Sequence, residues 1–469
     1  MTDVKKDKHT LIQSEEQARA LYAPPPAGFH GKVGLEVEMP LYRPGATKPD
    51  IPPPATMAQM HKILKDAGYD AQLEPAGVLE YASPPVDVRD VSKLVVQSKS
   101  DIAVFEKVIG EHGYARAPFA ILPTTTPQDA LDNKVSRERL EASLAVLSEV
   151  YPPGLSNVPL LTTGVQTSFS PKSDDEMFRM AYRGYALTPL IVAAMNSSSG
   201  FAANDDKRRD DVHLRTKYYE DYGTAGGISA AFLKSETPEQ FIRNHIHEVF
   251  DNPMFFAYRD DGTLLRTTKD NVLTFRKLEA MGMNTLTNYE LAETFLYNDI
   301  KIANVRDSEG QVVGKRVEIR AADSGVHQPA STLLLTAALI PDGITAQKFD
   351  NLLKDYGFTG NPKQDADLLQ AARKNAVEHN GRFMNVPFGN GSLRDFAADV
   401  AALVIAHYER DRNVQPEVSK LAEVLLTGES DAKLNAAKYK TLADVTRDLQ
   451  ATVVKPLPAP KGPAPKNAA

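Results

Sequence analysis

Gly34-Leu35-Glu36-Val37-Glu38-Met39 is the stretch of this chain that decides its fold. Apolar and acidic residues alternate through it, and the two-residue period of a β-strand places the apolar side chains on one face and Glu36 and Glu38 on the other. A strand with one solvent-exposed face accounts for this pattern. A strand that lines a metal-filled cavity also accounts for it, because hard divalent cations take oxygen ligands from neighbouring carboxylates.

Polar side chains at even spacings recur in three distant segments, residues 73–80, 163–170 and 316–320. The side chains that share a face are Glu74 and Glu80 in the first, Gln166, Ser168 and Ser170 in the second, and Arg316, Glu318 and Arg320 in the third. Pro75 and Gly77 indicate a turn within the first segment. A sheet or half-barrel with a polar concave face would collect all four segments into one site for a charged substrate and metal.

The length and composition of the chain are those of a large globular protein. Its 469 residues exceed the usual size of a single core, which predicts one large elaborated domain or two closely joined domains. The formal net charge of −7 and the lack of a basic stripe argue against nucleic acid as a partner. There is no cysteine, so disulfides, thiolate catalysis and cysteine-ligated metal sites are excluded.

The N-terminal segment is charged and no apolar stretch follows it, so we expect no signal peptide. The longest apolar run, around residues 186–195, contains Thr188 and Pro189 and is too short to span a bilayer. These features predict a cytoplasmic protein that does not associate with membranes.

We expect four regions along the chain. Residues 1–30 form a tail with a short helix (14–21), strands and helices alternate over residues 31–330, helices dominate residues 331–454, and residues 455–469 form a disordered tail rich in Pro, Ala and Lys. Periodicity and capping signals predict further helices over residues 57–67, 91–113, 174–194, 237–249, 288–296, 330–339, 363–379, 392–409, 416–426 and 432–452.

The polar segments resemble motifs of the plant- and proteobacterial-type glutamate–cysteine ligases, which belong to the glutamine-synthetase-like carboxylate–amine ligases. That family has a G-x-E-x-E strand, an L-E-P-G-G-x-x-E turn, a V-Q pair followed by an acidic helix start, a proline and N-S, and finally L-E-M-R-x-A-D-x-G. The matching residues, in the same order, are Gly34-Leu35-Glu36-Val37-Glu38, Leu73-Glu74-Pro75-Ala76-Gly77-Val78-Leu79-Glu80, Val165-Gln166, Asp174-Asp175-Glu176, Pro189, Asn196-Ser197 and Val317-Glu318-Ile319-Arg320-Ala321-Ala322-Asp323-Ser324-Gly325. The shared order carries the resemblance more than any single motif does.

The resemblance implies an α+β fold in which a curved antiparallel sheet, or half-barrel, lines the active site. Helices would lie outside the sheet, residues 31–330 would form the catalytic domain, and the mostly helical C-terminal region would pack on it. The implied activity is that of an ATP- and Mg²⁺-dependent ligase with two or more metal ions. A substrate carboxylate attacks the γ-phosphate of ATP to give an acyl phosphate, and an amine then displaces phosphate.

The resemblance also implies roles for individual residues. One Mg²⁺ ion would be held by Glu36, Glu74 and Glu80, another by Glu38, Glu318 and Gln166; Gln166, Ser168 and Arg320 would contact nucleotide or the transferring phosphate, Glu318 and Arg320 would be catalytic, and Arg215 and Asn196 would bind substrate. Simpler roles exist for several of them. Glu74 or Glu80 could cap the turn, Gln166 could bond within the sheet, and Arg320 could pair with Glu318 or Asp323.

Two regions depart from the family's pattern. After Arg215 the family usually has an Asp-Arg-Gly loop, but residues 219–227 lack that arginine. The tryptophan and histidine expected near Tyr289 and Glu290 are also absent. We therefore expect a glutamate-like carboxylate and an amine as substrates, as in glutamate–cysteine ligase, or a different amine, peptide or protein as acceptor. A phosphotransferase that forms no amide and a binding protein without turnover are further alternatives.

Other polar motifs have simpler interpretations. His245 and His247 are two residues apart on a predicted helix and cannot share a face, so we do not expect them to bind metal. Residues 205–211 are interpreted as a solvated loop, with a lid over the site as the alternative. Residues 389–392 predict a loop and helix N-cap rather than a phosphate cradle. The acids at residues 174–176 suit the positive end of a helix dipole.

Overall fold

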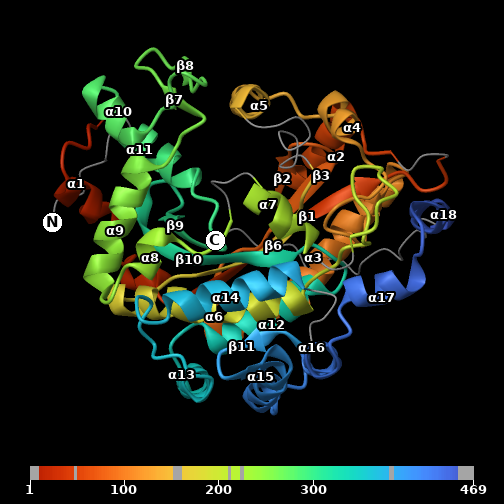
Figure 1. Ribbon diagram of the computed structural model, residues 1–469. Coiled ribbons are helices and arrows are strands. Elements are labelled where there is room, and N and C mark those ends of the chain that lie inside the picture. Colours follow the sequence, from red (N-terminus) through yellow and green to blue (C-terminus); the bar gives the residue numbers. More distant parts are fainter. Residues whose placement is uncertain are drawn as a thin grey trace, which may run out of the picture.

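An antiparallel sheet forms the centre of the molecule, with helices around it (Figure 1). The computed structural model describes residues 10–46, 50–150, 161–209, 213–221, 226–379 and 385–452, and the tail predicted at residues 455–469 lies outside them. In the order β2, β3, β1, β6, β10 and β9, the main strands are Asp70–Glu74, Val78–Ala82, Lys32–Tyr42, Gly164–Phe169, Val312–Asp323 and Ile300–Arg306. The short strands β4 (Val86–Asp87) and β5 (Ala115–Arg116) also pair with β1. This sheet with helices outside it confirms the predicted fold class.

The pairing registers bring the predicted polar residues onto one face of the sheet. Every neighbouring pair along the main path is antiparallel. Residues that lie directly opposite each other are Glu38 and Glu80, Glu36 and Gln166, and Ser168 and Glu318. Because opposite residues in an antiparallel pair project to the same side, these side chains form one continuous polar face.

The other face of the sheet is apolar and is covered by helices. Val33 and Leu35 of β1 are at most 1% exposed. Helix α6 (Asp174–Ala194) packs against β10, α12 (Gln328–Leu339) packs against β1 and β6, and α14 (Ala366–Glu378) lies on α6 (Figure 1). A one-residue slip in any of these strands would expose its apolar side chains, so this burial fixes the registers that build the polar face.

The helical region predicted after residue 330 is present. Besides α12 and α14 it contains α13 (Ile344–Asp355), α15 (Leu393–Tyr408), α16 (Gln415–Thr427), α17 (Asp431–Lys438) and α18 (Leu442–Ala451). Helix α13 was not predicted from the sequence. Helices α12 to α16 share one hydrophobic core with the sheet. The single helix predicted over residues 432–452 is wrong, because Thr441 and Asp444 form a capping box that starts α18 as a new helix. The predicted boundary at residue 330 stays a prediction.

All six helices predicted before residue 330 are present within a few residues of their predicted ends. They are α1 (Glu15–Arg19), α2 (Pro54–Asp66), α3 (Val91–Glu111), α6, α9 (Pro238–Asp251) and α11 (Leu286–Thr294). Sequence reasoning missed α4 (Pro127–Asp132), α5 (Glu138–Val150), α7 (Leu214–Asp221), α8 (Ala230–Leu233), α10 (Phe275–Ala280), strand β9 and the hairpin of β7 (Phe256–Tyr258) and β8 (Leu264–Arg266). Several of these elements are short and lack a clear apolar period.

Two predicted helix starts are confirmed. Asp174 and Glu176 lie in the first turn of α6. The Ser392 side chain caps α15 by accepting the N–H of Asp395, after the short hairpin of β11 (Pro387–Phe388) and β12 (Gly391–Ser392). Residues 389–392 are therefore part of a hairpin and a helix cap.

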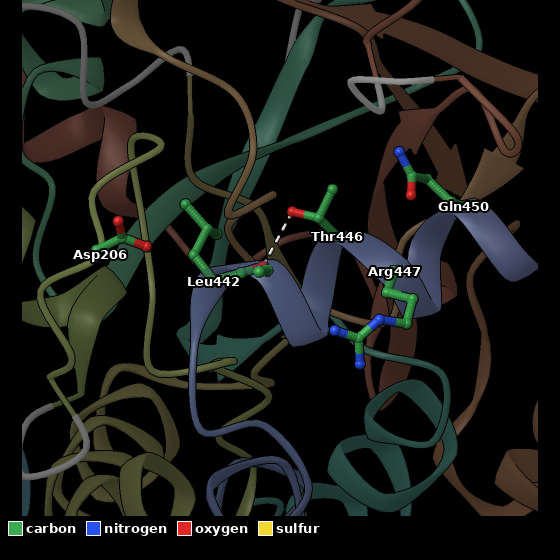
Figure 2. Close-up of a pocket in the computed structure, with 6 residues that line it drawn as sticks. Asp206, Leu442, Thr446, Arg447 and Gln450 are labelled. Carbon is green, nitrogen blue, oxygen red and sulfur yellow. Dashed lines mark hydrogen bonds between the residues drawn. The ribbon is translucent and has the colours of Figure 1, made fainter.

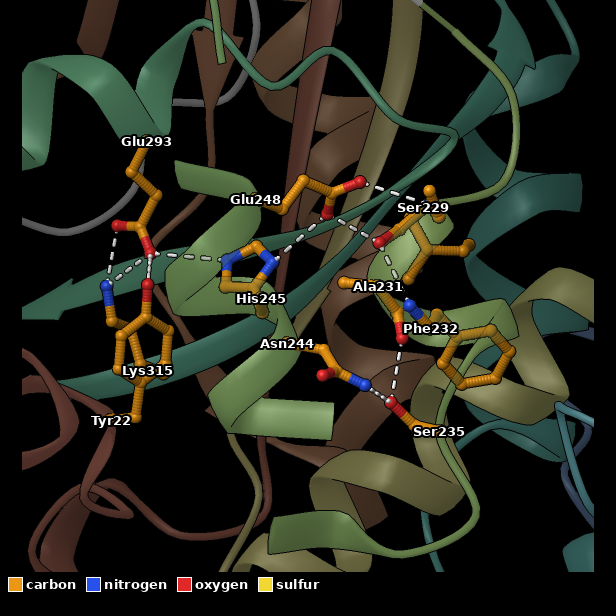
Figure 3. A network of polar contacts seen from close by, with 12 residues as sticks. Tyr22, Ser229, Ala231, Phe232, Ser235, Asn244, His245, Glu248, Glu293 and Lys315 are labelled. Atoms are coloured by element: carbon orange, nitrogen blue, oxygen red, sulfur yellow. Dashed lines mark hydrogen bonds and ion pairs between the residues drawn. The ribbon is translucent and has the colours of Figure 1, made fainter. Parts of the chain in front are cut away.

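A buried charged network, shown in Figure 3, joins β10 to the helices on its apolar side. The Lys315 ammonium donates to both oxygens of Glu293 at 2.7 and 2.6 Å, and Tyr22 donates to the same carboxylate at 2.7 Å. His245 lies between Glu293 and Glu248, at 3.6 and 3.7 Å. Charged side chains can be buried when they are paired in this way. His245 is therefore part of a structural ion-pair network.

The described part of the predicted lid, residues 205–209, contacts the C-terminal helices, and residues 210 and 211 lie outside the description. Arg208 donates to the Ala436 carbonyl of α17 at 2.6 Å. Asp206 lines an open cavity together with Leu442, Thr446 and Arg447 of α18 (Figure 2). These contacts tie the loop to α17 and α18, and a closing movement stays untested. No helix in the described ranges is long and apolar enough to cross a membrane.

Candidate active site

The polar face of the sheet divides into an acidic half and a basic half. Strands β1, β2 and β3 contribute the acidic half, which consists of Glu36, Glu38, Glu74 and Glu80. Strands β9 and β10 contribute the basic half, which consists of Lys301, Arg316 and Arg320 around Glu318. Strand β6 lies between the halves and carries Gln166 and Ser168. All five predicted metal carboxylates are thus on one face.

The four carboxyls of the acidic half crowd one another in a buried place. Burial is the main cause that raises each pKa, and repulsion by neighbouring carboxylates adds to it. The pKa of Glu74 is raised to about 7 and that of Glu80 to about 9. A bound cation would reduce the repulsion among these four acidic side chains.

The basic half is organised around Glu318, which is 2% exposed. One carboxylate oxygen of Glu318 accepts from Arg320, and the other accepts from Arg316 at 2.9 Å. Burial alone would raise the pKa of Glu318, but the positive charges of Arg320, Arg316 and Lys301 lower it to about 2. Glu318 is therefore ionised, and the predicted salt bridge between Arg320 and Glu318 is present.

A β-bulge aims Arg320 at the centre of the face. The register of β10 against β6 shifts by one residue between Ile319 and Ala322. A bulge of this kind re-aims side chains and is frequent beside active sites. Here the Arg320 guanidinium donates to the Gln166 side-chain oxygen at 2.6 Å.

Gln166 connects the two halves of the site. Its amide nitrogen donates to Glu38 at 3.3 Å, while its oxygen accepts from Arg320. The other oxygen of Glu38 accepts the Gly164 backbone N–H at 2.5 Å. Gln166 thus makes hydrogen bonds to neighbouring strands of the sheet and also lies among the charged groups. A role within the sheet and a role as metal ligand or nucleotide contact are both compatible with this position.

Arg215 approaches the site from helix α7, which lies over the polar face. Its guanidinium donates to the Arg320 carbonyl at 3.0 Å and lies over the Tyr219 ring at 5.7 Å. The close approach depends on Gly164, because a Cβ there would lie 2.5 Å from the guanidinium. Its charge also lowers the pKa of Glu38 against the larger effect of burial.

The last two predicted residues have different surroundings. Ser168 lies on the polar face, where its hydroxyl accepts from Arg316 at 3.1 Å. Asn196 is 1% exposed in the loop after α6, and its side-chain oxygen accepts the Ser198 N–H at 2.8 Å. Asn196 shapes its own loop, and its assignment to substrate binding stays a prediction.

Sequence reasoning missed Lys301 as a site residue. It lies opposite Glu318 in the register of β9 and β10, so it projects to the polar face. The alternation Ile300-Lys301-Ile302 was the available signal, but it is short. Tyr297 and Asn298 were missed as well, and they line a small cavity with Arg215 and Arg320.

The donor chemistry of the acidic half fits Mg²⁺, which prefers carboxylate oxygens. In the described part of the chain no three His, Asp or Glu side chains already converge as a metal-binding group. Two of the predicted ligands already accept hydrogen bonds: Glu38 accepts from N–H groups of Gly164 and Gln166, and Glu318 accepts from Arg316 and Arg320. A metal ion held by Glu38 or Glu318 would have to share their oxygens with these donors or displace them.

Comparisons with known proteins give the fold. No protein-family model and no curated protein matches the chain. Among solved structures, the glutamate–cysteine ligase of Francisella tularensis in complex with AMP matches with a TM-score of 0.52 and 11% identity, over 92% of this chain and 91% of that chain. The complex of the prokaryotic ubiquitin-like protein Pup with its ligase PafA matches at 0.33 (9% identity, 89% and 68% covered), and apo GmaS at 0.27 (10% identity, 91% and 72% covered). The last two scores are too low to carry an argument. Over nearly its whole length, this chain therefore has the fold of the Francisella glutamate–cysteine ligase, as its motifs predicted.

Proposed function

We propose that this protein is an ATP- and Mg²⁺-dependent carboxylate–amine ligase that forms an amide bond through an acyl phosphate. The observation that carries the proposal is the divided face, on which four crowded carboxyls adjoin a group of arginines. Transfer of a phosphoryl group needs such a pair of halves, one to hold cations and one to hold anions. The fold shared with glutamate–cysteine ligase supports the same reaction class.

In this proposal Glu36, Glu74 and Glu80 hold one Mg²⁺ ion, and Glu38, Glu318 and Gln166 hold another. The ions supply neutralisation of polyphosphate charge when bound. Arg320 neutralises charge on the transferring phosphoryl group, and Gln166 and Ser168 contact the nucleotide. Arg215 binds a carboxylate of the substrate. The nucleophile is the carboxylate of the substrate itself, so the chain needs no activated serine or cysteine.

A glutamate-like carboxylate and an amine, as in glutamate–cysteine ligase, are the substrates that we propose first. A different amine, or a peptide or protein, is the second candidate for the acceptor. The observation that favours it is the sequence at residues 219–227, where the family arginine is absent. Residues 222–225 of that segment lie outside the described ranges, so the difference rests on sequence alone.

The proposed reaction is tested by measuring ADP release against a panel of carboxylates and amines, with the products identified by mass spectrometry. Hydroxylamine added in place of the amine traps an acyl phosphate as a hydroxamate. Hydroxamate together with ADP supports the ligase. ADP with a stable phosphorylated product would identify a phosphotransferase, and no turnover with any substrate would identify a binding protein.

The variant Glu318→Gln tests the site. It removes the charge that both Arg316 and Arg320 contact, so we expect ADP release to fall by about 100-fold or more. Glu309→Gln is a matched control, because Glu309 is exposed in the turn between β9 and β10. Unchanged activity of Glu318→Gln would remove Glu318 from the site.

A further inference from the structure

Lys301 is a cation of the basic half on which the charges of Glu318 and Glu293 act at a distance, without a hydrogen bond to either carboxylate. Arg316 and Arg320 already take both oxygens of Glu318. Within the described residues, the Lys301 ammonium makes no hydrogen bond and no ion pair. Burial and the positive charges of Arg320 and Arg316 outweigh the attraction of Glu318 and Glu293 and lower the pKa of Lys301 to about 8, so an anion bound at the ammonium would stabilise its charge.

The anion would lie on the polar face of the sheet, to which Lys301 projects. Lys301 projects to the polar face because it lies opposite Glu318. The small cavity that Lys301 lines with Asn298 is bounded mainly by Phe241, Ile300 and Ile302, so it is not the place of the anion. Asn298 also lines the cavity formed by Arg215 and Arg320. Among the strands described, β9 is the edge of the main sheet, so no further strand covers this end of the face.

Resting on the proposed function, we propose that Lys301 is an anion-binding residue of the site, which donates to an oxygen of the terminal phosphoryl group of ATP or of the carboxylate that receives it. Both ligands present the same chemistry, an anionic oxygen at the point where phosphoryl transfer occurs. Charge-assisted hydrogen bonds of this kind are about twice as strong as neutral ones. The role of Lys301 differs from that of Arg320, which is already bonded to Glu318 and Gln166.

Calorimetry on the full-length protein with the variants Lys301→Met and Lys301→Arg tests this role. The probes are a non-hydrolysable ATP analogue, ADP, and the carboxylate found to be most active in the ADP-release assay, or glutamate where none is active. A phosphoryl contact weakens binding of the ATP analogue to Lys301→Met by about tenfold and leaves ADP unchanged, whereas a carboxylate contact weakens binding of the carboxylate alone. Lys301→Arg keeps the charge and restores most of the affinity in either case.

The matched control is Lys62→Met, because Lys62 is exposed on α2 and pairs with Asp66. Thermal unfolding of all variants shows whether each one folds. A purely structural Lys301 would change the melting temperature while all three affinities stay as in the wild type, and that result overturns the inference, as does a wild type that binds none of the probes. A wild type that binds them but releases no ADP with any carboxylate overturns the proposed function instead.

Discussion

Single residues set the charge of this site, and the clearest case is Glu80. Its carboxyl lies opposite Glu38 and near Glu36 and Glu74, and burial together with their charges raises its pKa to about 9. The unfolded chain has an ordinary glutamate pKa near 4.5. The folded state therefore binds more protons than the unfolded state between these two values.

This difference predicts a stability that depends on pH and on metal. The contribution of Glu80 is fully present below about pH 4.5 and is lost as the pH rises through about 9. In EDTA we expect the free energy of unfolding, measured with urea, to fall from pH 6 to pH 9, and Mg²⁺ to reduce that slope. Glu80→Gln should flatten the slope in EDTA. An equal slope in this variant would show that other groups cause it.

Gly164 is a second single residue on which the site depends, because it leaves room for the Arg215 guanidinium. An added Cβ would lie 2.5 Å from the Arg215 guanidinium and 3.2 Å from the Ala322 carbonyl. We expect Gly164→Ala to displace Arg215, to cost about 1–3 kcal/mol of stability and to raise the KM for the carboxylate substrate. Gly34→Ala is the matched control on the neighbouring strand, because nothing lies within 4 Å of its Cβ. Similar effects of both changes would show that the loss comes from replacing a glycine in a strand and not from the contact with Arg215.

At the scale of elements, α6 supports the sheet and is itself anchored to the C-terminal helices. Arg183 of α6 is 2% exposed and donates twice to Asp350 of α13, at 2.8 and 2.7 Å. It also donates to Asp342 at 2.8 Å. The connection between the layers is therefore a bidentate ion pair between a buried guanidinium and the carboxylate of Asp350, which is 33% exposed.

We expect Arg183→Ala to lower the free energy of unfolding by about 2–3 kcal/mol, because it removes a buried guanidinium together with its hydrogen bonds to Asp350, Asp342 and the Ile340 carbonyl. Arg179→Ala is the control one turn away. Arg179 pairs with the same Asp342 but is 46% exposed, so its loss should cost less than about 1 kcal/mol. Urea unfolding compares the two variants. A cost for Arg179→Ala as large as for Arg183→Ala would contradict the role given to burial.

Across the whole molecule, the sequence predicted the polar face of the sheet but not all of the residues that contribute to it. Alternation in β1 and β10 was strong enough to predict which side chains share a face, because their apolar residues are buried. Strand pairing then brought the distant segments together. Lys301 and α7 were missed since β9 has a short pattern and α7 has a polar sequence with no apolar period. Contacts such as that of Arg215 with Gly164 depend on tertiary distance, which one sequence does not contain.

The strand order of the sheet also determines when the site can exist during folding. Neighbours β1 and β6, and then β6 and β10, pair segments that are far apart along the chain. Contacts of this kind form late, because long loops must close before they are gained. The acidic half can assemble from β1 to β3 alone, while the basic half waits for the last strands. A nascent or partly unfolded chain would therefore expose the negative charge of the acidic half. Only the complete sheet places the positive charges of the basic half beside it.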